Sequence, residues 1–126
     1  MKTILAILLF ATVAQAEPWT VTAYCPCRQC CGKADGIMAN GKRVHVGAAA
    51  VNHLPFGTKL YVDDIGTVTV EDRGHKRYFG DWRRRIRRMD IFMPTHAQAV
   101  AFGVKVLNVE RFAPVMVAGD CSILVW

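Results

Sequence analysis

The sequence has few acidic residues and few histidines, and it lacks the motifs of several functional classes. It contains 10 Asp and Glu against 16 Lys and Arg, a formal net charge of +6. Its four histidines form no H-E-x-x-H motif and show no other metal-type spacing. We find no repeat, linker or low-complexity segment, and nothing that resembles a nucleic-acid-reading module. We therefore expect no nucleic-acid partner, and we expect surface or packing roles for His45, His53, His75 and His96.

Long apolar runs are also missing. The run Ile4–Val13 is shorter than the roughly 20 residues that cross a bilayer. It follows Lys2 and precedes Ala14-Gln15-Ala16, a small-x-small cleavage pattern. We predict a signal peptide at 1–16, a secreted or periplasmic protein and no stable membrane insertion. The remaining 126 − 16 = 110 residues suit one domain with a charge of +5, which favours an anionic surface or polymer.

Short segments of alternating apolar and polar residues predict a mostly β domain. The expected strands are 19–24, 47–51, 59–63, 67–72, 89–93 and 104–112, with a C-terminal hairpin at 115–117 and 123–125. Segment 25–46 is rich in Gly, Cys and polar residues and is predicted to be a long loop. This pattern indicates a compact barrel rather than a βαβ sheet.

One short helix is expected at Thr95–Phe102. Thr95 is a natural N-cap, and Gln98 three residues later completes a capping box. The side chains expected to face the core are Ala97, Val100 and Ala101.

Two carboxylates stand in apolar contexts. Asp90 lies between Met89 and Ile91, and such surroundings raise the pKa of a carboxyl group by desolvation. Asp72 ends an apolar strand. A proton-donating acid beside a second carboxylate is the pairing used to cleave glycosidic bonds. The alternative is that Asp90 forms a structural ion pair with a neighbouring arginine.

An arginine run follows at 81–88, with the letters DWRRRIRR. Guanidinium groups bind carboxylates and phosphates strongly, so Arg83–Arg88 could contact an anionic polymer of the cell envelope. The alternative is a solvated basic loop.

The five cysteines are best explained by disulfides. The adjacent pair Cys30 and Cys31 differs from the usual C-x₂₋₄-C spacing of zinc sites, and export favours oxidation. We therefore expect no metal and no cofactor. A cluster residue is expected to pair with Cys121 and so tie a C-terminal extension, 113–126, to the front loop. The disulfide candidates are Cys25, Cys27, Cys30, Cys31 and Cys121.

Seven short motifs follow one another over residues 20–110. They are TAYC (22–25), CGKADGIMANG (31–41), AAAV (48–51), LPFGTKL (54–60), VEDRG (70–74), MDIF (89–92), and HAQA (96–99) followed by FG (102–103). In this order they resemble the three-aspartate (3D) domain of bacterial cell-wall proteins. The resemblance implies a small six-stranded double-psi β-barrel. It also implies kinship with the catalytic domain of membrane-bound lytic transglycosylase A and, more distantly, with expansins and barrel-type endoglucanases.

The resemblance also implies an activity. Such lytic enzymes cut the β-1,4 bond between N-acetylmuramic acid and N-acetylglucosamine in peptidoglycan without water, leaving a 1,6-anhydro sugar. Carried over to this chain, Asp90 would be the general acid/base and Asp72 its neighbouring carboxylate. The residues expected to bind the glycan strand are Tyr24, Gly36, Gly41, Thr58 and Arg73.

Two departures from the family pattern keep a second reading open. Asn52 stands where the family's first aspartate usually lies, and Asp72 and Asp90 are 90 − 72 = 18 positions apart, more than is usual. The alternative function is therefore a non-catalytic, expansin-like barrel that binds cell-wall polysaccharide.

Overall fold

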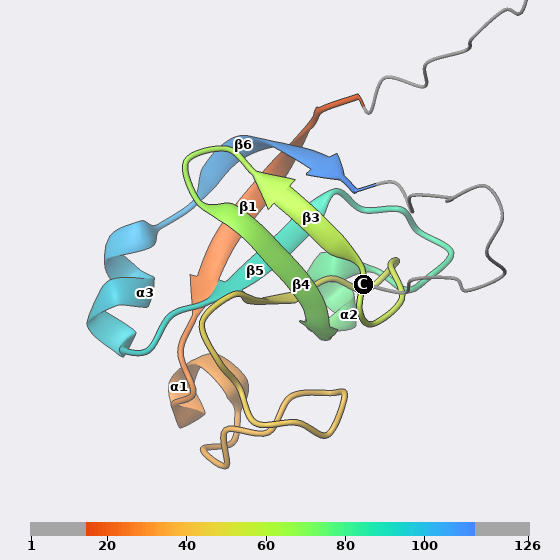
Figure 1. The fold of residues 1–126 in the computed structure, drawn as a ribbon. Helices are drawn as coiled ribbons and strands as arrows, with labels where there is room; N and C mark the ends of the chain where they lie inside the picture. Colours follow the sequence, from red (N-terminus) through yellow and green to blue (C-terminus); the bar gives the residue numbers. More distant parts are fainter. Residues whose placement is uncertain (1–14, 113–126) are drawn as a thin grey trace, which may run out of the picture.

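The computed structural model describes residues 15–112 (Figure 1). Most of the predicted signal peptide, the C-terminal extension with its predicted hairpin, and Cys121 lie outside the described residues. Within the described part, no helix is long and apolar enough to cross a membrane. The elements are β1 (Glu17–Tyr24), α1 (Arg28–Cys31), β2 (Ala48–Ala50), β3 (Lys59–Val62), β4 (Gly66–Asp72), α2 (Lys76–Phe79), β5 (Arg88–Phe92), α3 (His96–Phe102) and β6 (Lys105–Arg111).

The six strands close into a barrel in the order β1-β5-β2-β4-β3-β6. Two pairs, β1 with β5 and β2 with β4, run parallel, and the remaining pairs are antiparallel. The predicted fold class, a mostly β domain with a small six-stranded barrel, is confirmed. Closure removes the unpaired strand edges that would otherwise expose backbone hydrogen-bonding groups.

The barrel interior is filled by alternate residues of its strands, because successive side chains of a strand point to opposite faces. Every strand except the short β2 supplies at least one β-branched or long apolar side chain, and Ala49 of β2 completes the set. These buried residues are Trp19, Val21, Ala49, Val51, Leu60, Val62, Val68, Val70, Met89, Ile91 and Val109.

The helices differ in part from the prediction. The capping box of α3 is confirmed, since Thr95 accepts from the Gln98 amide and Gln98 accepts from that of Thr95. A single-turn helix, α1, occurs within the predicted loop 25–46, and a second, α2, occurs in a segment for which no element was predicted.

The predicted core face of α3 is wrong, because Ala97, Val100 and Ala101 are exposed. The helix lies at one end of the barrel and packs against β1 (Figure 1). At this position it buries only Ala99, while Phe102 packs against the barrel core.

Candidate functional site

Four side chains at one register level form a row across neighbouring strands. Thr22 of β1 pairs with Asp90 of β5, Asp90 pairs with Ala50 of β2, and Ala50 pairs with Asp72 of β4. The two carboxylates therefore lie on either side of one alanine. Adjacent strands are about 4.8 Å apart, so the two aspartate backbones are separated by roughly 10 Å. Both side chains face away from the barrel interior.

This row forms the floor of a groove with a volume of about 710 Å³. The walls come from the segment around α1 and from the segment around α2 that leads to β5. The lining includes Tyr24, Cys30, Cys31, Lys33, Ile37, Ala39, Arg73, His75, Tyr78, Phe79 and Arg88 besides the row itself. The groove thus combines aromatic rings, basic groups and two acids, the side-chain types suited to a polar, ring-shaped ligand.

Asp90 is the desolvated acid of the groove. Burial raises the pKa of its carboxyl group to about 6, and the nearby charge of Asp72 adds to this, against the opposing effects of Thr22 and Arg88. The Thr22 hydroxyl donates to Oδ1 of Asp90 over 3.2 Å. In residues 15–112, Asp90 belongs to no ion pair, so the structural ion pair considered from the sequence is not formed there.

The cause of this burial differs from the one inferred from the sequence. Met89 and Ile91 flank Asp90 in the chain, but both point into the barrel core. Strand alternation places Asp90 on the opposite face, so its immediate neighbours in sequence do not surround it. The carboxyl group faces the groove, and residues that line the groove shield it from water. They include Arg88, Phe79 and Tyr78.

Asp72 has a different environment, because three donors hold it. The Tyr24 hydroxyl donates to Oδ2 over 3.0 Å, and the backbone amides of Ala39 and Arg73 donate to Oδ1 over 2.9 and 2.8 Å. Burial, and then the charge of Asp72, raise the pKa of Tyr24 well above its usual range, so Tyr24 stays a donor. Asp72 therefore connects β1, β4 and the 25–46 segment through one carboxylate.

The other predicted binding residues are only partly brought together. Arg73 lies in the groove, where its guanidinium donates to the Val51 carbonyl over 2.7 Å and stacks 3.9 Å from the centre of the Phe56 ring. Gly36 lines a much smaller neighbouring cleft. Gly41 and Thr58 line neither cavity within the described part of the chain.

Asn52, which the sequence comparison with the 3D-domain pattern singled out, has a clear structural role. Its Nδ2 group donates to the carbonyls of Gly74 and Gly80 over 3.0 and 2.7 Å, and its Oδ1 accepts from the Gly74 amide over 2.7 Å. An aspartate could make only the last of these bonds, because an ionised carboxylate has no donor. Asn52 thus ties down both ends of the loop that carries α2.

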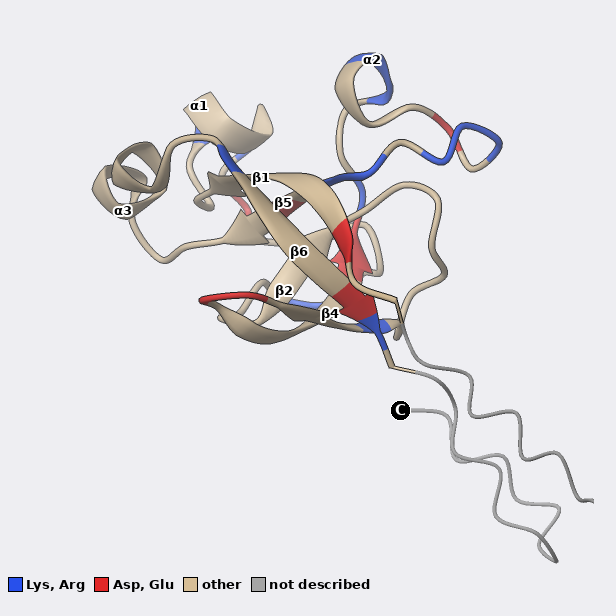
Figure 2. Cartoon of the chain, turned by 90° about the horizontal axis from the view of Figure 1, so that it is seen from above, with Lys and Arg blue, Asp and Glu red and all other residues tan. Residues whose placement is uncertain are grey.

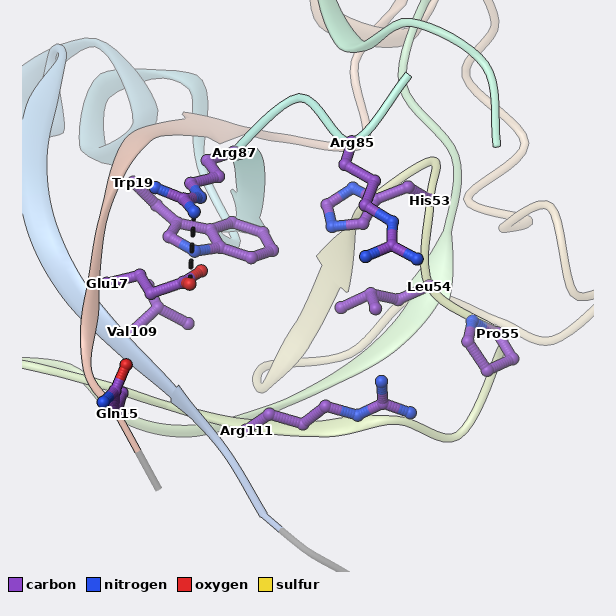
Figure 3. A pocket seen from close by; sticks show the side chains of 10 residues that line it. All are labelled: Gln15, Glu17, Trp19, His53, Leu54, Pro55, Arg85, Arg87, Val109 and Arg111. Atoms are coloured by element: carbon purple, nitrogen blue, oxygen red, sulfur yellow. Dashed lines mark hydrogen bonds and ion pairs between the residues drawn. The ribbon is translucent and has the colours of Figure 1, made fainter. Parts of the chain in front are cut away.

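The arginine run divides between two cavities. Arg88 lines the groove with Asp90, whereas Arg85 and Arg87 line a second cavity of about 550 Å³. Lys and Arg residues gather along α2 and the following loop (Figure 2). Figure 3 shows the second cavity, where Arg87 pairs with Glu17 over 3.1 Å and Arg111 contributes another guanidinium.

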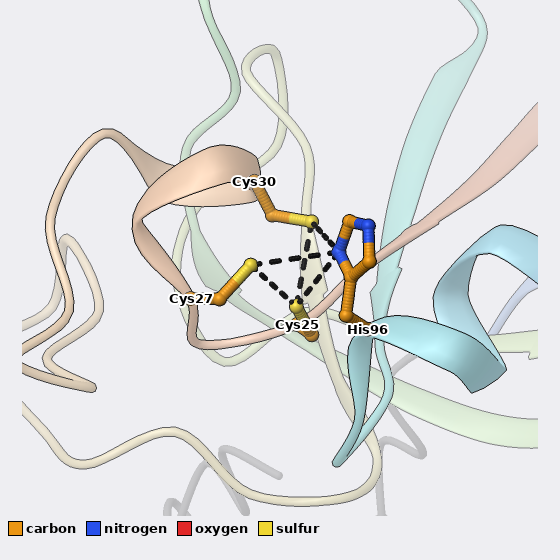
Figure 4. Close-up of side chains that lie close together, drawn as sticks. All are labelled: Cys25, Cys27, Cys30 and His96. Carbon is orange, nitrogen blue, oxygen red and sulfur yellow. Dashed lines mark hydrogen bonds between the residues drawn. The ribbon is translucent and has the colours of Figure 1, made fainter.

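The cysteine segment forms a cluster that sequence reasoning did not anticipate. The sulfurs of Cys25, Cys27 and Cys30 surround Nδ1 of His96 (Figure 4). None of the four described cysteines is bonded to another, so no disulfide forms within the segment. The predicted bridge to Cys121 lies outside the described residues. His96 was missed because it lies 66 to 71 positions away in sequence.

Two other groove residues, Thr22 and Arg88, were also not named as site residues from the sequence. Thr22 could have been found from its place in the TAYC motif, whereas the arginine run contained no signal to single out Arg88.

Comparison with known proteins adds no assignment: no protein-family model matches this chain, and no curated protein matches it.

Proposed function

We propose that this protein is a secreted enzyme that cleaves peptidoglycan glycan strands, with Asp90 as its general acid/base. The observation that carries the proposal is the carboxyl group of Asp90, whose pKa is raised to about 6 and which opens on a groove containing a second carboxylate. A general acid works best when its pKa lies near the pH at which it operates. The motif resemblance to the 3D domain supplies the substrate class.

The proposed reaction is that of a lytic transglycosylase and needs one dominant acid. Protonated Asp90 donates its proton to the glycosidic oxygen as the bond to the anomeric carbon breaks. The resulting Asp90 carboxylate then takes the proton from the C6 hydroxyl of the same sugar, whose oxygen attacks the anomeric carbon. The proton lost in the first step is recovered in the second, and no water is consumed.

Asp72 would assist without exchanging a proton. Its two oxygens are occupied by Tyr24, Ala39 and Arg73, which fix it at the far side of Ala50 from Asp90. A fixed negative charge favours the positive charge that develops on the sugar ring in the transition state. It also helps to keep Asp90 protonated before the reaction.

The basic side chains of the groove would bind the anionic parts of the substrate. Arg73 and Arg88 both line the groove. Arg85 and Arg87 open on the second cavity instead, so they would contact an anionic envelope polymer away from the reacting bond.

Product analysis tests this proposal. Purified peptidoglycan is incubated with the protein, and the soluble material is examined by mass spectrometry. We expect anhydro-muropeptides from the unaltered protein and none from Asp90→Asn. Products with ordinary reducing ends would indicate a hydrolase. Co-sedimentation with the wall but no soluble product from either protein would contradict cleavage and indicate the expansin-like binding barrel.

A further inference from the structure

We propose that Cys25, Cys27, Cys30 and His96 form a structural zinc site at the end of the barrel. The three sulfur atoms and one imidazole nitrogen lie within 4.8 Å of one another. Three thiolates and one histidine are a common donor set for structural Zn²⁺, which prefers four ligands in a tetrahedron.

The distances from the imidazole nitrogen to the sulfurs match such a tetrahedron, whereas the sulfur–sulfur distances are shorter than it requires. Zn–S bonds of about 2.3 Å and Zn–N bonds of about 2.0–2.1 Å require S···N separations of about 3.5–3.6 Å and S···S separations of about 3.8 Å. Nδ1 of His96 lies 3.6 Å from each of the three sulfurs. The sulfur of Cys25 lies 2.9 and 3.4 Å from those of Cys27 and Cys30. A small outward movement of two sulfurs would complete the geometry.

A disulfide accounts for less of this arrangement. Bonded sulfurs are about 2.05 Å apart. A single disulfide would also leave the positions of the third thiol and the imidazole unexplained. Here the same imidazole nitrogen is equidistant from three sulfurs that come from a single six-residue segment (Figure 4). Convergence of four donors on one point is the property that a tetrahedral cation requires.

The backbone holds these donors from two independent directions. Cys25 follows β1 and is buried, while Cys30 lies on the single turn of α1, whose Cys31 amide bonds to the Cys27 carbonyl over 3.0 Å. His96 is the first residue of α3, which the capping box of Thr95 and Gln98 fixes in place. Zinc would thus join the 25–31 segment to α3.

The fourth cysteine of the segment lies outside the site. The Cys31 thiol donates to the Cys25 carbonyl over 3.1 Å, and Cys31 lines the groove. Four protein ligands also fill a zinc ion's coordination, which leaves no open position for catalysis. The site would therefore hold one wall of the groove in place, because Cys30 and Cys31 both contribute to that wall.

Zinc content of the full chain tests the proposal. The chain is produced with its own N-terminal segment and purified without chelator, and bound metal is measured by plasma mass spectrometry. We expect one zinc per chain, with the three ligand thiols resistant to alkylation until a chelator is added. Cobalt in place of zinc should give the intense visible absorption of a tetrahedral thiolate site.

Matched variants assign the ligands. Cys30→Ser and His96→Gln should each weaken zinc binding by at least about 100-fold, since loss of an outer partner alone costs about 10- to 100-fold. Cys31→Ser, one position away, should retain one zinc per chain. His96→Cys should restore binding through four thiolates, which separates loss of a ligand from failure to fold.

Three results would overturn the proposal. They are an unaltered chain that binds no zinc, zinc binding that Cys30→Ser and His96→Gln leave unchanged, and a disulfide between any two of Cys25, Cys27 and Cys30 in the protein as purified. Each is independent of whether the protein cleaves peptidoglycan.

Discussion

The two aspartates of the groove have contrasting environments, because Asp72 is held by several hydrogen bonds and Asp90 is desolvated. On the β4 side, Asp72 accepts one hydroxyl and two amide hydrogen bonds. On the β5 side, Asp90 accepts one hydroxyl hydrogen bond, from Thr22, and burial raises its pKa to about 6. Both residues belong to the same register row, with only Ala50 between them. The difference therefore arises from the groups around the row: Tyr24 of β1 and the amides of Ala39 and Arg73 reach Asp72 but not Asp90.

The difference in environment suits the two aspartates to two different roles, structural anchoring and proton transfer. A carboxylate whose oxygens accept hydrogen bonds from fixed donors acts as a structural anchor. A carboxyl group that is desolvated and sparsely hydrogen-bonded can bind and release a proton near neutral pH. Exchanging each aspartate for asparagine removes the charge with little change of shape, so the two exchanges compare the two sides directly.

The largest effect is expected for Asp90→Asn on the rate of cleavage. Loss of a general acid costs about 10²- to 10⁴-fold, so the release of soluble muropeptides should fall by that factor. Asp63→Asn is the matched control, because Asp63 is exposed next to the β3–β4 turn and lies outside the groove. An equal loss in both variants would contradict a specific role for Asp90.

The same exchange should raise stability while it lowers activity. The folded protein binds a proton at Asp90 up to pH about 6, whereas an ordinary aspartate has lost it above 3.8. Stability of the unaltered protein should therefore fall as pH rises from about 4 to 6. Asp90→Asn removes this loss and should stabilise the fold at pH 7 by up to about 3 kcal/mol.

Asp72→Asn should change stability in the opposite direction. Asparagine keeps one acceptor oxygen for the two amides but places a donor opposite the Tyr24 hydroxyl, which must then accept instead of donate. The three hydrogen bonds therefore lose their charged partner. Hydrogen bonds to a charged group contribute about 1.5–3 kcal/mol, and the free energy of unfolding should decrease by about that amount. Urea unfolding of Asp90→Asn and Asp72→Asn at pH 7 measures both changes in the free energy of unfolding, an increase for the first variant and a decrease for the second. Shifts of the same sign would contradict the comparison.

A change of similar or slightly smaller size is expected for Asn52→Asp, although this exchange introduces the aspartate that the 3D-domain pattern has at this position. The Gly74 and Gly80 carbonyls would lose their donor, and an unpaired buried acceptor costs about 1–3 kcal/mol. We expect unfolding at a lower urea concentration and a lower cleavage rate, because the α2 loop forms part of the groove. Asn108→Asp, on exposed β6, is the control. A stable and more active Asn52→Asp protein would show that the aspartate has a catalytic role here.

The smallest effect is expected for Tyr24→Phe. This variant removes one of the three donors of Asp72 but keeps the ring packed against Phe92, with the two ring centres 5.8 Å apart. Stability should fall by about 1–2 kcal/mol. Tyr61→Phe, on the exposed face of β3, should leave urea unfolding unchanged. Equal stability of Tyr24→Phe and the unaltered protein would mean that the two amides alone anchor Asp72.

The barrel could be predicted from local sequence pattern because most of its strands alternate apolar and polar residues and the chain is short. The strands were located to within one or two residues, and the capping box identified α3. The inward face of that helix was misjudged. Its five apolar positions fit more than one face, and only the position of α3 at the end of the barrel selects Ala99.

The groove residues that could be predicted are those that an apolar sequence context or the motif resemblance named. Asp72, Asp90, Tyr24 and Arg73 do meet in one groove. The reason for the burial of Asp90 could not be read from its neighbours, since Met89 and Ile91 face the other way. The fourth member of the cysteine cluster, His96, is brought near only by the packing of α3 on β1, which no spacing rule describes.

The most direct test of the central claim is an NMR titration of the Asp90 side-chain carboxyl carbon, assigned by its absence in Asp90→Asn. We predict a midpoint near pH 6, a lower midpoint in Asp72→Asn, and a cleavage rate that falls above the same pH as the acid loses its proton. A midpoint near 3.8, the usual value for aspartate, would contradict the account, because Asp90 would then hold no proton to donate at neutral pH.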